Sequence, residues 1–245
     1  MRPPFTVDQF LDSFTRYNEA VWPAQIGFYV VAALLVTLAL RPSRRSSLWI
    51  SGLLAVLWAW MGIVYHWGFF ARINTAAYLF GSVFLLQSLA FVVAAAGRER
   101  ISFRFAADGY GRIGAALVAY ALIVYPIIGA LAGHGYPNGP TFGLPCPTTI
   151  ATFGLLLWVR GRVPGWLFVI PAVWSIVGSS AAFRFGILED YGLLAAGVVG
   201  TVAIARKNRQ WRKRVRQLAA EEASRKQTPL PGNELPRPAD ALDLA

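Results

Sequence analysis

Long apolar stretches, separated by short polar or glycine- and proline-containing breaks, fill most of the chain. About 20 mainly apolar residues let an α-helix cross roughly 30 Å of hydrocarbon. We therefore predict an all-α, polytopic membrane helix bundle with about seven transmembrane helices. Their expected ranges are 24–40, 48–67, 76–96, 113–132, 145–159, 165–183 and 190–205. The fifth is too short to span the bilayer alone, so we expect neighbouring segments to supply the missing thickness.

The N-terminal residues 1–22 follow an amphipathic pattern instead. Apolar residues recur at helical spacing, and charged residues occupy the opposite side. The apolar side carries Val7, Phe10, Leu11, Phe14, Tyr17 and Val21, and the charged side carries Asp8, Asp12, Arg16 and Glu19. Thr6 and Gln9 have the spacing of a capping box. We predict an amphipathic helix, which either lies flat on the membrane interface or packs on the loops of the bundle.

Small residues form a stripe along the second predicted helix at steps of three and four. The stripe consists of Ser51, Ala55, Ala59, Gly62 and His66. Small residues on one helix face let a neighbouring backbone approach closely. We therefore expect His66 to point into the bundle, near the membrane edge.

Residues 129–149, between the fourth and fifth predicted helices, are uncharged and rich in glycine and proline. These residues break a regular helix, yet Tyr136, Phe142 and Leu144 are too apolar for an ordinary exposed loop. We predict a folded, partly re-entrant connection. It holds His134, one of two histidines, and Cys146, the only cysteine. A single cysteine excludes an intramolecular disulfide and paired-cysteine metal sites within one chain.

Composition and charge place the predicted helices in a membrane and orient them. Hydrophobic residues make up 56% of the chain and charged residues only 14%, and the mean hydropathy is +0.49. Soluble domains carry about 25% charged residues. Assigning successive connections to alternate sides puts most of the 23 Lys and Arg residues on one side. By the positive-inside rule, the N-terminus is expected outside and the C-terminus in the cytoplasm.

Beyond residue 205 the chain becomes strongly basic and amphipathic. Residues expected at lipid headgroups are Arg206, Lys207, Arg209, Trp211, Arg212, Lys213, Arg214 and Arg216. Each cation near an anionic surface contributes about 1 kcal/mol, so we expect anionic lipid as the partner and no nucleic acid. The predicted organisation is an external amphipathic helix (1–22), a transmembrane domain (23–205), a basic cytoplasmic helix (206–226) and a disordered tail (227–245).

The candidate chemistry gathers at the external face in this topology. The candidate ligand or metal residues are His66, His134 and Cys146, and the accompanying polar cluster is Arg72, Arg184, Glu189 and Asp190. Imidazole and thiolate suit soft metals, and two facing imidazoles could ligate a haem. The favoured alternative is structural hydrogen bonding by both histidines, so we expect no cofactor.

Several segments resemble a family of bacterial multi-pass membrane proteins known only as a domain of unknown function. They are residues 16–25, 58–74, 77–81 and 133–149. The resemblance covers roughly residues 5–205 and leaves out the basic tail. It implies a bacterial multi-pass membrane protein and no assigned activity. We expect the protein to lie in the bacterial inner membrane.

Three functions remain open from the sequence. The first is a non-enzymatic membrane protein that binds a small ligand at its external face. The second is a transporter of a small solute or soft metal, suggested by Pro126 and Pro171 within helices. The third is a sensor or scaffold acting through the basic tail. Acidic residues are missing from the middle of the predicted spans, which argues against a proton relay. A homo-oligomer is compatible with all three.

Overall fold

The computed structural model describes residues 5–97 and 101–227. Within these ranges the chain is an all-α bundle with two isolated β-bridges and no strand, as predicted. The α-helices are α1 (Val7–Ala20), α2 (Ala24–Leu40), α3 (Arg44–Trp60), α4 (Ala77–Ala96), α5 (Gly109–Ala119), α6 (Tyr125–Leu131), α7 (Pro145–Leu157), α8 (Val169–Phe185) and α9 (Tyr191–Gln227). Two π-helical segments, η1 (Met61–Phe69) and η3 (Tyr120–Val124), and three short 3-10 turns, η2 (Phe70–Arg72), η4 (Gly165–Leu167) and η5 (Leu188–Asp190), connect some of them.

Several helices are long and apolar enough to cross a membrane, as expected of a membrane protein. In the described ranges there are five such helices: Arg45–Arg72, Ala77–Ala96, Gly109–Leu131, Gly165–Phe185 and Leu188–Arg225. The helices α1 and α2 together make a sixth candidate that is bent by 87°. The remaining apolar helix, α7, has only 13 residues. All seven predicted segments are therefore helical, but two of them fall short of a full span on their own.

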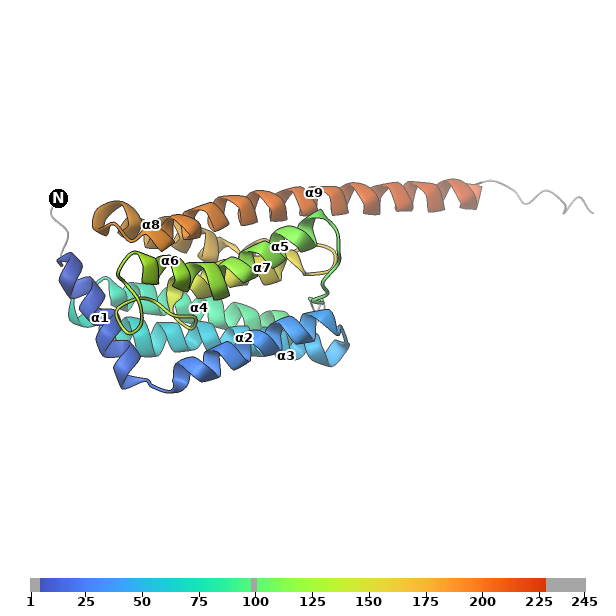
Figure 1. Ribbon diagram of the computed structural model, residues 1–245. Coiled ribbons are helices and arrows are strands. Elements are labelled where there is room, and N and C mark those ends of the chain that lie inside the picture. The colour runs from blue at the N-terminus through green and yellow to red at the C-terminus, as the bar shows by residue number, and fades with distance from the viewer. Residues whose placement is uncertain (1–4, 98–100, 228–245) are drawn as a thin grey trace, which may run out of the picture. The chain divides into compact units, whose positions relative to one another are not determined.

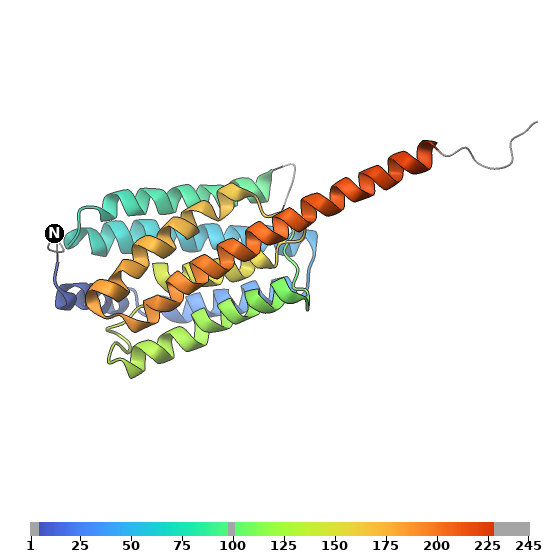
Figure 2. The same ribbon diagram turned by 90° about the horizontal axis from the view of Figure 1, so that it is seen from above.

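The short helix α7 lies at the centre of the bundle. Every one of its 13 residues is buried. Figure 2 shows α7, in yellow, enclosed by the other helices. Protein therefore surrounds α7 along its length, and its shortness does not bring its ends into contact with hydrocarbon.

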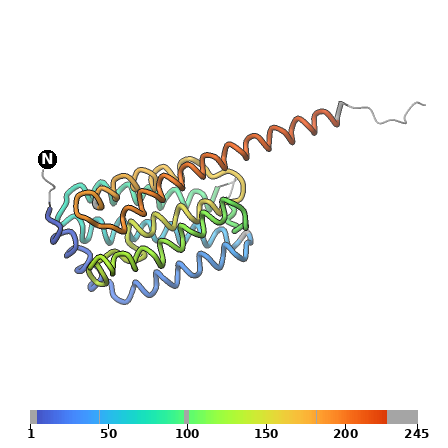
Figure 3. Tube along the Cα trace, turned by 45° about the horizontal axis from the view of Figure 1, so that its top comes forward, coloured from blue at the N-terminus to red at the C-terminus, as the bar shows by residue number. Residues whose placement is uncertain are grey.

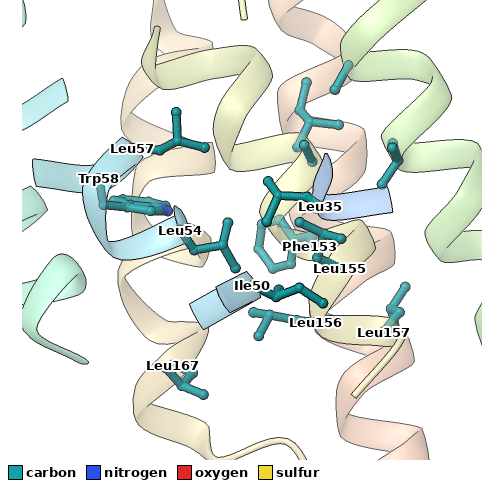
Figure 4. Packing of buried hydrophobic residues seen from close by; sticks show 14 of the residues in the cluster. Leu35, Ile50, Leu54, Leu57, Trp58, Phe153, Leu155, Leu156, Leu157 and Leu167 are labelled. Atoms are coloured by element: carbon teal, nitrogen blue, oxygen red, sulfur yellow. The ribbon is translucent and has the colours of Figure 1, made fainter. Parts of the chain in front are cut away.

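The core around α7 is built from large aliphatic and aromatic side chains. Leu35, Ile50, Leu54 and Trp58 from α2 and α3 pack against Phe153, Leu155 and Leu156 of α7 (Figure 4). Between apolar helices in a membrane, association depends on such close packing more than on the hydrophobic effect.

Glycines let two pairs of segments approach backbone to backbone. A Cβ atom added at Gly62 of η1 would lie 2.8 Å from the carbonyl oxygen of Gly81 in α4. A Cβ atom at Gly114 of α5 would lie 2.6 Å from the carbonyl oxygen of Gly154 in α7. The predicted stripe on residues 51–66 is confirmed as a packing face, because Gly62 makes this close approach and Ser51, Ala55 and His66 are buried.

Each of the two π-helical segments contains or adjoins a residue that the sequence analysis singled out, His66 or Pro126. The segment η1 continues α3 and contains His66, and η3 ends just before Pro126. Pro126 has no backbone N–H to donate, and η3 with α6 takes the place of a regular helix there. Short π-helical segments are frequent at functional sites, so the position of His66 in η1 is compatible with a functional role.

The chain divides into two units, residues 1–208 and 209–245. The first unit extends past the predicted boundary at residue 205. Lys207 Nζ donates hydrogen bonds of 2.6 Å to the carbonyl oxygens of Leu157 and Val159, and the Asn208 side chain pairs with the backbone of Val163 at 2.8 Å. Lys207, predicted to contact lipid headgroups, is therefore bound to the end of α7 instead.

In the second unit, the described side chains of residues 209–225 are exposed. The predicted basic helix is confirmed as helical, since α9 continues to Gln227. Residues 228–245 of the predicted disordered tail lie outside the described residues.

Candidate functional site

The N-terminal helix α1 lies across one end of the bundle (Figures 1 and 3). Its predicted capping box is confirmed, because Thr6 Oγ1 accepts a hydrogen bond from the Gln9 N–H and Gln9 Oε1 accepts one from the Thr6 N–H. Phe10, Phe14 and Tyr17 form a buried cluster with Tyr65 and Phe70. Of the two predicted placements, the structure therefore has α1 packed on the bundle.

Hydrogen bonds fix α1 to the connection between α6 and α7. Asn18 Nδ2 donates to the carbonyl oxygens of Pro137 at 2.6 Å and Gly139 at 2.9 Å. The Thr15 hydroxyl donates to Asn138 Oδ1 at 2.9 Å. The glycine- and proline-rich connection is therefore folded, as the sequence predicted, and it is hydrogen-bonded to α1.

Tyr17 ties the same helix to α3. Trp60 Nε1 donates a hydrogen bond of 2.8 Å to the Tyr17 hydroxyl. Burial raises the pKa of Tyr17 to about 12, although the hydrogen bond from Trp60 lowers it in part. The phenol therefore stays neutral at all physiological pH values and acts as a fixed anchor.

A cavity of about 230 Å³ lies beneath α1. Aromatic rings form a large part of its wall: Phe5, Phe10, Phe14, Tyr65, Phe70, Phe80, Trp174 and Phe185. Polar side chains also line it: His66, Asn74, Cys146, Ser180, Arg184 and Asp190. Ligand pockets typically combine an apolar wall with a few placed polar groups, and this cavity has that composition.

His66 is the most unusual member of the lining. Its side chain is 0% exposed, and among the described residues neither ring nitrogen has a hydrogen-bond partner. The imidazole is packed instead against rings, with centroid distances of 4.6 Å to Phe84 and 5.2 Å to Trp174. Nearly all buried polar groups in proteins are hydrogen-bonded. An unpaired imidazole in a cavity wall therefore calls for an explanation.

Trp174 presents a second unpaired group to the same cavity. Its indole Nε1 is buried and, in the part of the chain that the structure describes, has no acceptor. Indole nitrogen only donates. The cavity thus holds one unpaired donor beside an imidazole that can both donate and accept.

Asp190 and Cys146 form the polar floor of the cavity. The Tyr125 hydroxyl donates a hydrogen bond of 2.6 Å to Asp190 Oδ1, and the Cys146 thiol also interacts with this carboxyl group. Cys146 stands near the start of α7, and Asp190 directly precedes α9. The Asp190 carboxyl group is thus already hydrogen-bonded to Tyr125 and in contact with the Cys146 thiol.

The structure brings together four of the predicted site residues, His66, Cys146, Arg184 and Asp190, around one cavity. His134 and Glu189 form a separate pair, with Nδ1 of His134 3.9 Å from Oε1 of Glu189. Arg72 stacks over the Phe69 ring at 5.3 Å and lines a different depression, which it shares with the charged side of α1.

The metal and haem hypotheses find little support in this arrangement. Within residues 5–97 and 101–227, no group of three or more His, Cys, Asp and Glu side chains is placed to hold a metal ion. A bis-histidine clamp requires two imidazoles that face one another. His66 faces the aromatic cavity, while the nearest ionisable partner of His134 is Glu189.

The aromatic wall is the part of the site that sequence reasoning missed. Phe5 precedes α1, whereas Trp174 and Phe185 belong to α8, and their convergence depends on how these distant segments pack. One local signal was present, because Trp174 stands one helical turn before Gly178 and both line the cavity.

A family model described as "Family of unknown function (DUF6064)" matches residues 7–215. No curated protein and no solved structure matches the chain.

Proposed function

Since the chain belongs to DUF6064, a family of unknown function, we propose its function from the cavity: it is a membrane protein that binds a small organic molecule beneath α1. The observation that carries the proposal is the pair of unpaired polar groups, His66 and Trp174, in one aromatic cavity. A buried donor or acceptor without a partner costs about 1–3 kcal/mol. A ligand that pairs with both groups would recover this free energy.

The lining favours an organic ligand over an ion. Aromatic rings supply much of the contact surface, and two of the polar groups, Cys146 and Asp190, already interact with each other. Asp190, the acidic group in the wall, already accepts a hydrogen bond from Tyr125. A small molecule with an apolar body and one polar end meets these groups without leaving a buried charge uncompensated.

The site is proposed to face the outside of a bacterial inner membrane. The positive-inside rule supports this orientation, because basic residues concentrate at the connections on the side opposite α1 and in residues 206–216. The exposed basic part of α9 then lies in the cytoplasm, where anionic headgroups would attract it.

Binding is better supported than transport. A transporter alternates access to a site near the middle of the membrane. Here side chains of α7 and of the surrounding helices fill the middle of the bundle. Examples are Phe153 of α7 and Trp58 of α3, which are fully buried. The cavity lies at the end covered by α1, so binding without passage is the simpler function.

Thermal melting with a panel of small molecules tests the proposal. The panel comprises p-cresol, 4-methylcyclohexanol, hexanoate and hexylamine, so that aromatic, aliphatic, anionic and cationic ends are all sampled. A ligand that binds only the folded state at 100 times its Kd stabilises it by about 2.7 kcal/mol. We expect at least one member to raise the melting temperature of the purified protein.

A pair of variants on α8 locates the effect. Ser180 lines the cavity with an exposed side chain, so Ser180→Phe should block it. Ile176 is 67% exposed on the same helix, and Ile176→Phe serves as the matched control. Stabilisation that persists in Ser180→Phe, or a panel without any stabilising member, would refute binding in this cavity.

A further inference from the structure

We propose that the ligand is a single phenolic ring whose hydroxyl group lies between His66 and Trp174. The inference rests on the proposed function, and it adds the chemical class of the ligand. Its grounds are the size of the cavity, the nature of its wall and the hydrogen-bonding capacity of its unpaired groups.

The size of the cavity limits the ligand to one ring. An apolar cavity of about 150 Å³ holds benzene. The 230 Å³ beneath α1 therefore accommodates one six-membered ring with small substituents. A longer substituent would have to leave through the mouth of the cavity.

The wall suits an aromatic guest better than an aliphatic one. Phe10 and Phe14 meet edge to face at 4.8 Å, and Tyr65 and Phe70 stack at 5.8 Å. Aromatic pairs gain about 0.5–1.5 kcal/mol beyond the burial of their area when they adopt such arrangements. An aromatic ligand among these side chains can direct its ring edge at the face of one side-chain ring and accept the edge of another on its own face.

The polar end of the cavity matches a hydroxyl group. A phenol donates one hydrogen bond and accepts others. It can therefore accept from Trp174 Nε1 and donate to the free nitrogen of a neutral His66. An ammonium group offers no acceptor to Trp174, and Asp190 is already engaged by Tyr125. A carboxylate would lie against the negative faces of the aromatic wall.

Gly178 has no side chain beside the indole group of Trp174. A Cβ atom at this position would lie 3.1 Å from Trp174 Nε1. Because Gly178 itself lines the cavity, a side chain at this position would crowd the buried N–H group from the cavity side. Any larger residue would partly cover the only polar atom of Trp174.

The mouth of the cavity lies along α8. The exposed members of the lining, Val177, Ser180 and Arg184, follow one another at steps of three and four on one helix face. A phenolic ring could reach this mouth as a soluble phenol or as the ring of an isoprenoid quinol dissolved in the membrane, with its tail outside the cavity. Both sources share the ring and hydroxyl group on which the proposal depends.

Equilibrium binding of three matched probes tests the ring and its hydroxyl group separately. The probes are p-cresol, toluene, which lacks the oxygen, and 4-methylcyclohexanol, which lacks the aromatic ring. We expect the purified protein to bind p-cresol about ten-fold more tightly than toluene, because toluene cannot form the two buried hydrogen bonds. It should also bind p-cresol more tightly than 4-methylcyclohexanol, because the aliphatic ring cannot make the aromatic edge-to-face contacts.

Conservative variants then identify the partners of the hydroxyl group. Trp174→Phe and His66→Phe keep an aromatic ring and remove the nitrogen atoms, so each should reduce the preference for p-cresol over toluene to about three-fold or less while leaving toluene affinity nearly unchanged. Trp166→Phe, at a half-exposed indole outside the lining, should retain the full preference. Should His66→Phe fail to fold, Trp174→Phe alone decides.

The outcomes separate this inference from the proposed function. Equal affinities for p-cresol and toluene, or a preference that survives in both variants, would overturn the phenolic assignment. Tighter binding of 4-methylcyclohexanol or hexylamine would also overturn it, yet would support small-molecule binding in the cavity. Displacement of p-cresol by a short-chain isoprenoid quinol in liposomes assigns the ring to a membrane source, and retention of p-cresol assigns it to a soluble phenol.

Discussion

The Tyr125 hydroxyl and Asp190 Oδ1, 65 residues apart in sequence, are joined by a buried hydrogen bond of 2.6 Å. This contact links the start of α6 to the turn that precedes α9. It also fixes the carboxyl group that forms the floor of the cavity, together with Cys146. The geometry of the site therefore depends on a contact between α6 and η5 in addition to the contacts made by α1.

Loss of this contact should destabilise the bundle. Tyr125→Phe removes the hydroxyl that donates to the buried Asp190 Oδ1, which we expect to lower the free energy of unfolding by about 1–3 kcal/mol. The apparent melting temperature in detergent measures the effect. Tyr78→Phe, at a side chain that is 58% exposed, is the control. Equal melting temperatures for the two variants would mean that the Tyr125 contact contributes little.

Gly62 should tolerate no side chain. In Gly62→Ala the new Cβ atom would meet the Gly81 carbonyl oxygen at 2.8 Å, and a backbone atom cannot rotate away. Overpacking of this kind costs about 1–3 kcal/mol. Gly52→Ala in the same continuous helical segment is the control, because a Cβ atom there meets no described atom within 4 Å. The prediction fails if both variants melt alike.

Replacement of His66 by an apolar residue should cost no hydrogen bond. Both ring nitrogens lack partners among the residues described, so His66→Leu removes two unsatisfied groups as well as ring contacts. We expect the apo protein to melt close to the wild-type temperature and to lose its response to p-cresol. A large loss of apo stability would instead reveal a structural role for the imidazole.

The basic residues near the C-terminus should have two different roles: Lys207 stabilises the bundle, and the exposed cations after residue 208 bind anionic lipid. Lys207→Met removes two hydrogen bonds from a charged donor to the end of α7, and bonds to charged groups contribute about 1.5–3 kcal/mol each. It should therefore destabilise the bundle, whereas Lys213→Met, at an exposed position, should not.

Truncation after Asn208 tests the second role. We expect the shortened protein to keep its melting temperature and to bind anionic vesicles more weakly, because the exposed cations near the membrane are removed. Vesicle cosedimentation at low and high salt provides the measurement. A truncated protein that cannot be purified would place residues 209–227 within the folded core.

The orientation can be read from cysteine labelling. In a Cys146→Ala background, cysteine at Thr75 should react with an impermeant thiol reagent added outside intact cells, because it lies at the same end of the bundle as α1. Cysteine at Arg45, at the opposite end, should react only after permeabilisation. The reverse labelling pattern would invert the proposed topology.

Local patterns predicted the helices and the packing face well. The Thr6–Gln9 capping box and the stripe that includes Gly62 and His66 could be predicted because each depends on spacing within one helix. The pairing of His134 with Glu189 and of Lys207 with the end of α7 could not, because each joins segments about 50 residues apart. The aromatic wall escaped prediction for the same reason.

The enclosed position of α7 constrains how the protein is made. A helix of 13 residues is about 20 Å long, too short to serve as an independent insertion signal for a bilayer with about 30 Å of hydrocarbon. Its burial also involves α9, since Phe153 fills the space left by Gly200. The burial of α7 is therefore complete only after α9, which follows it in the chain, has been synthesised.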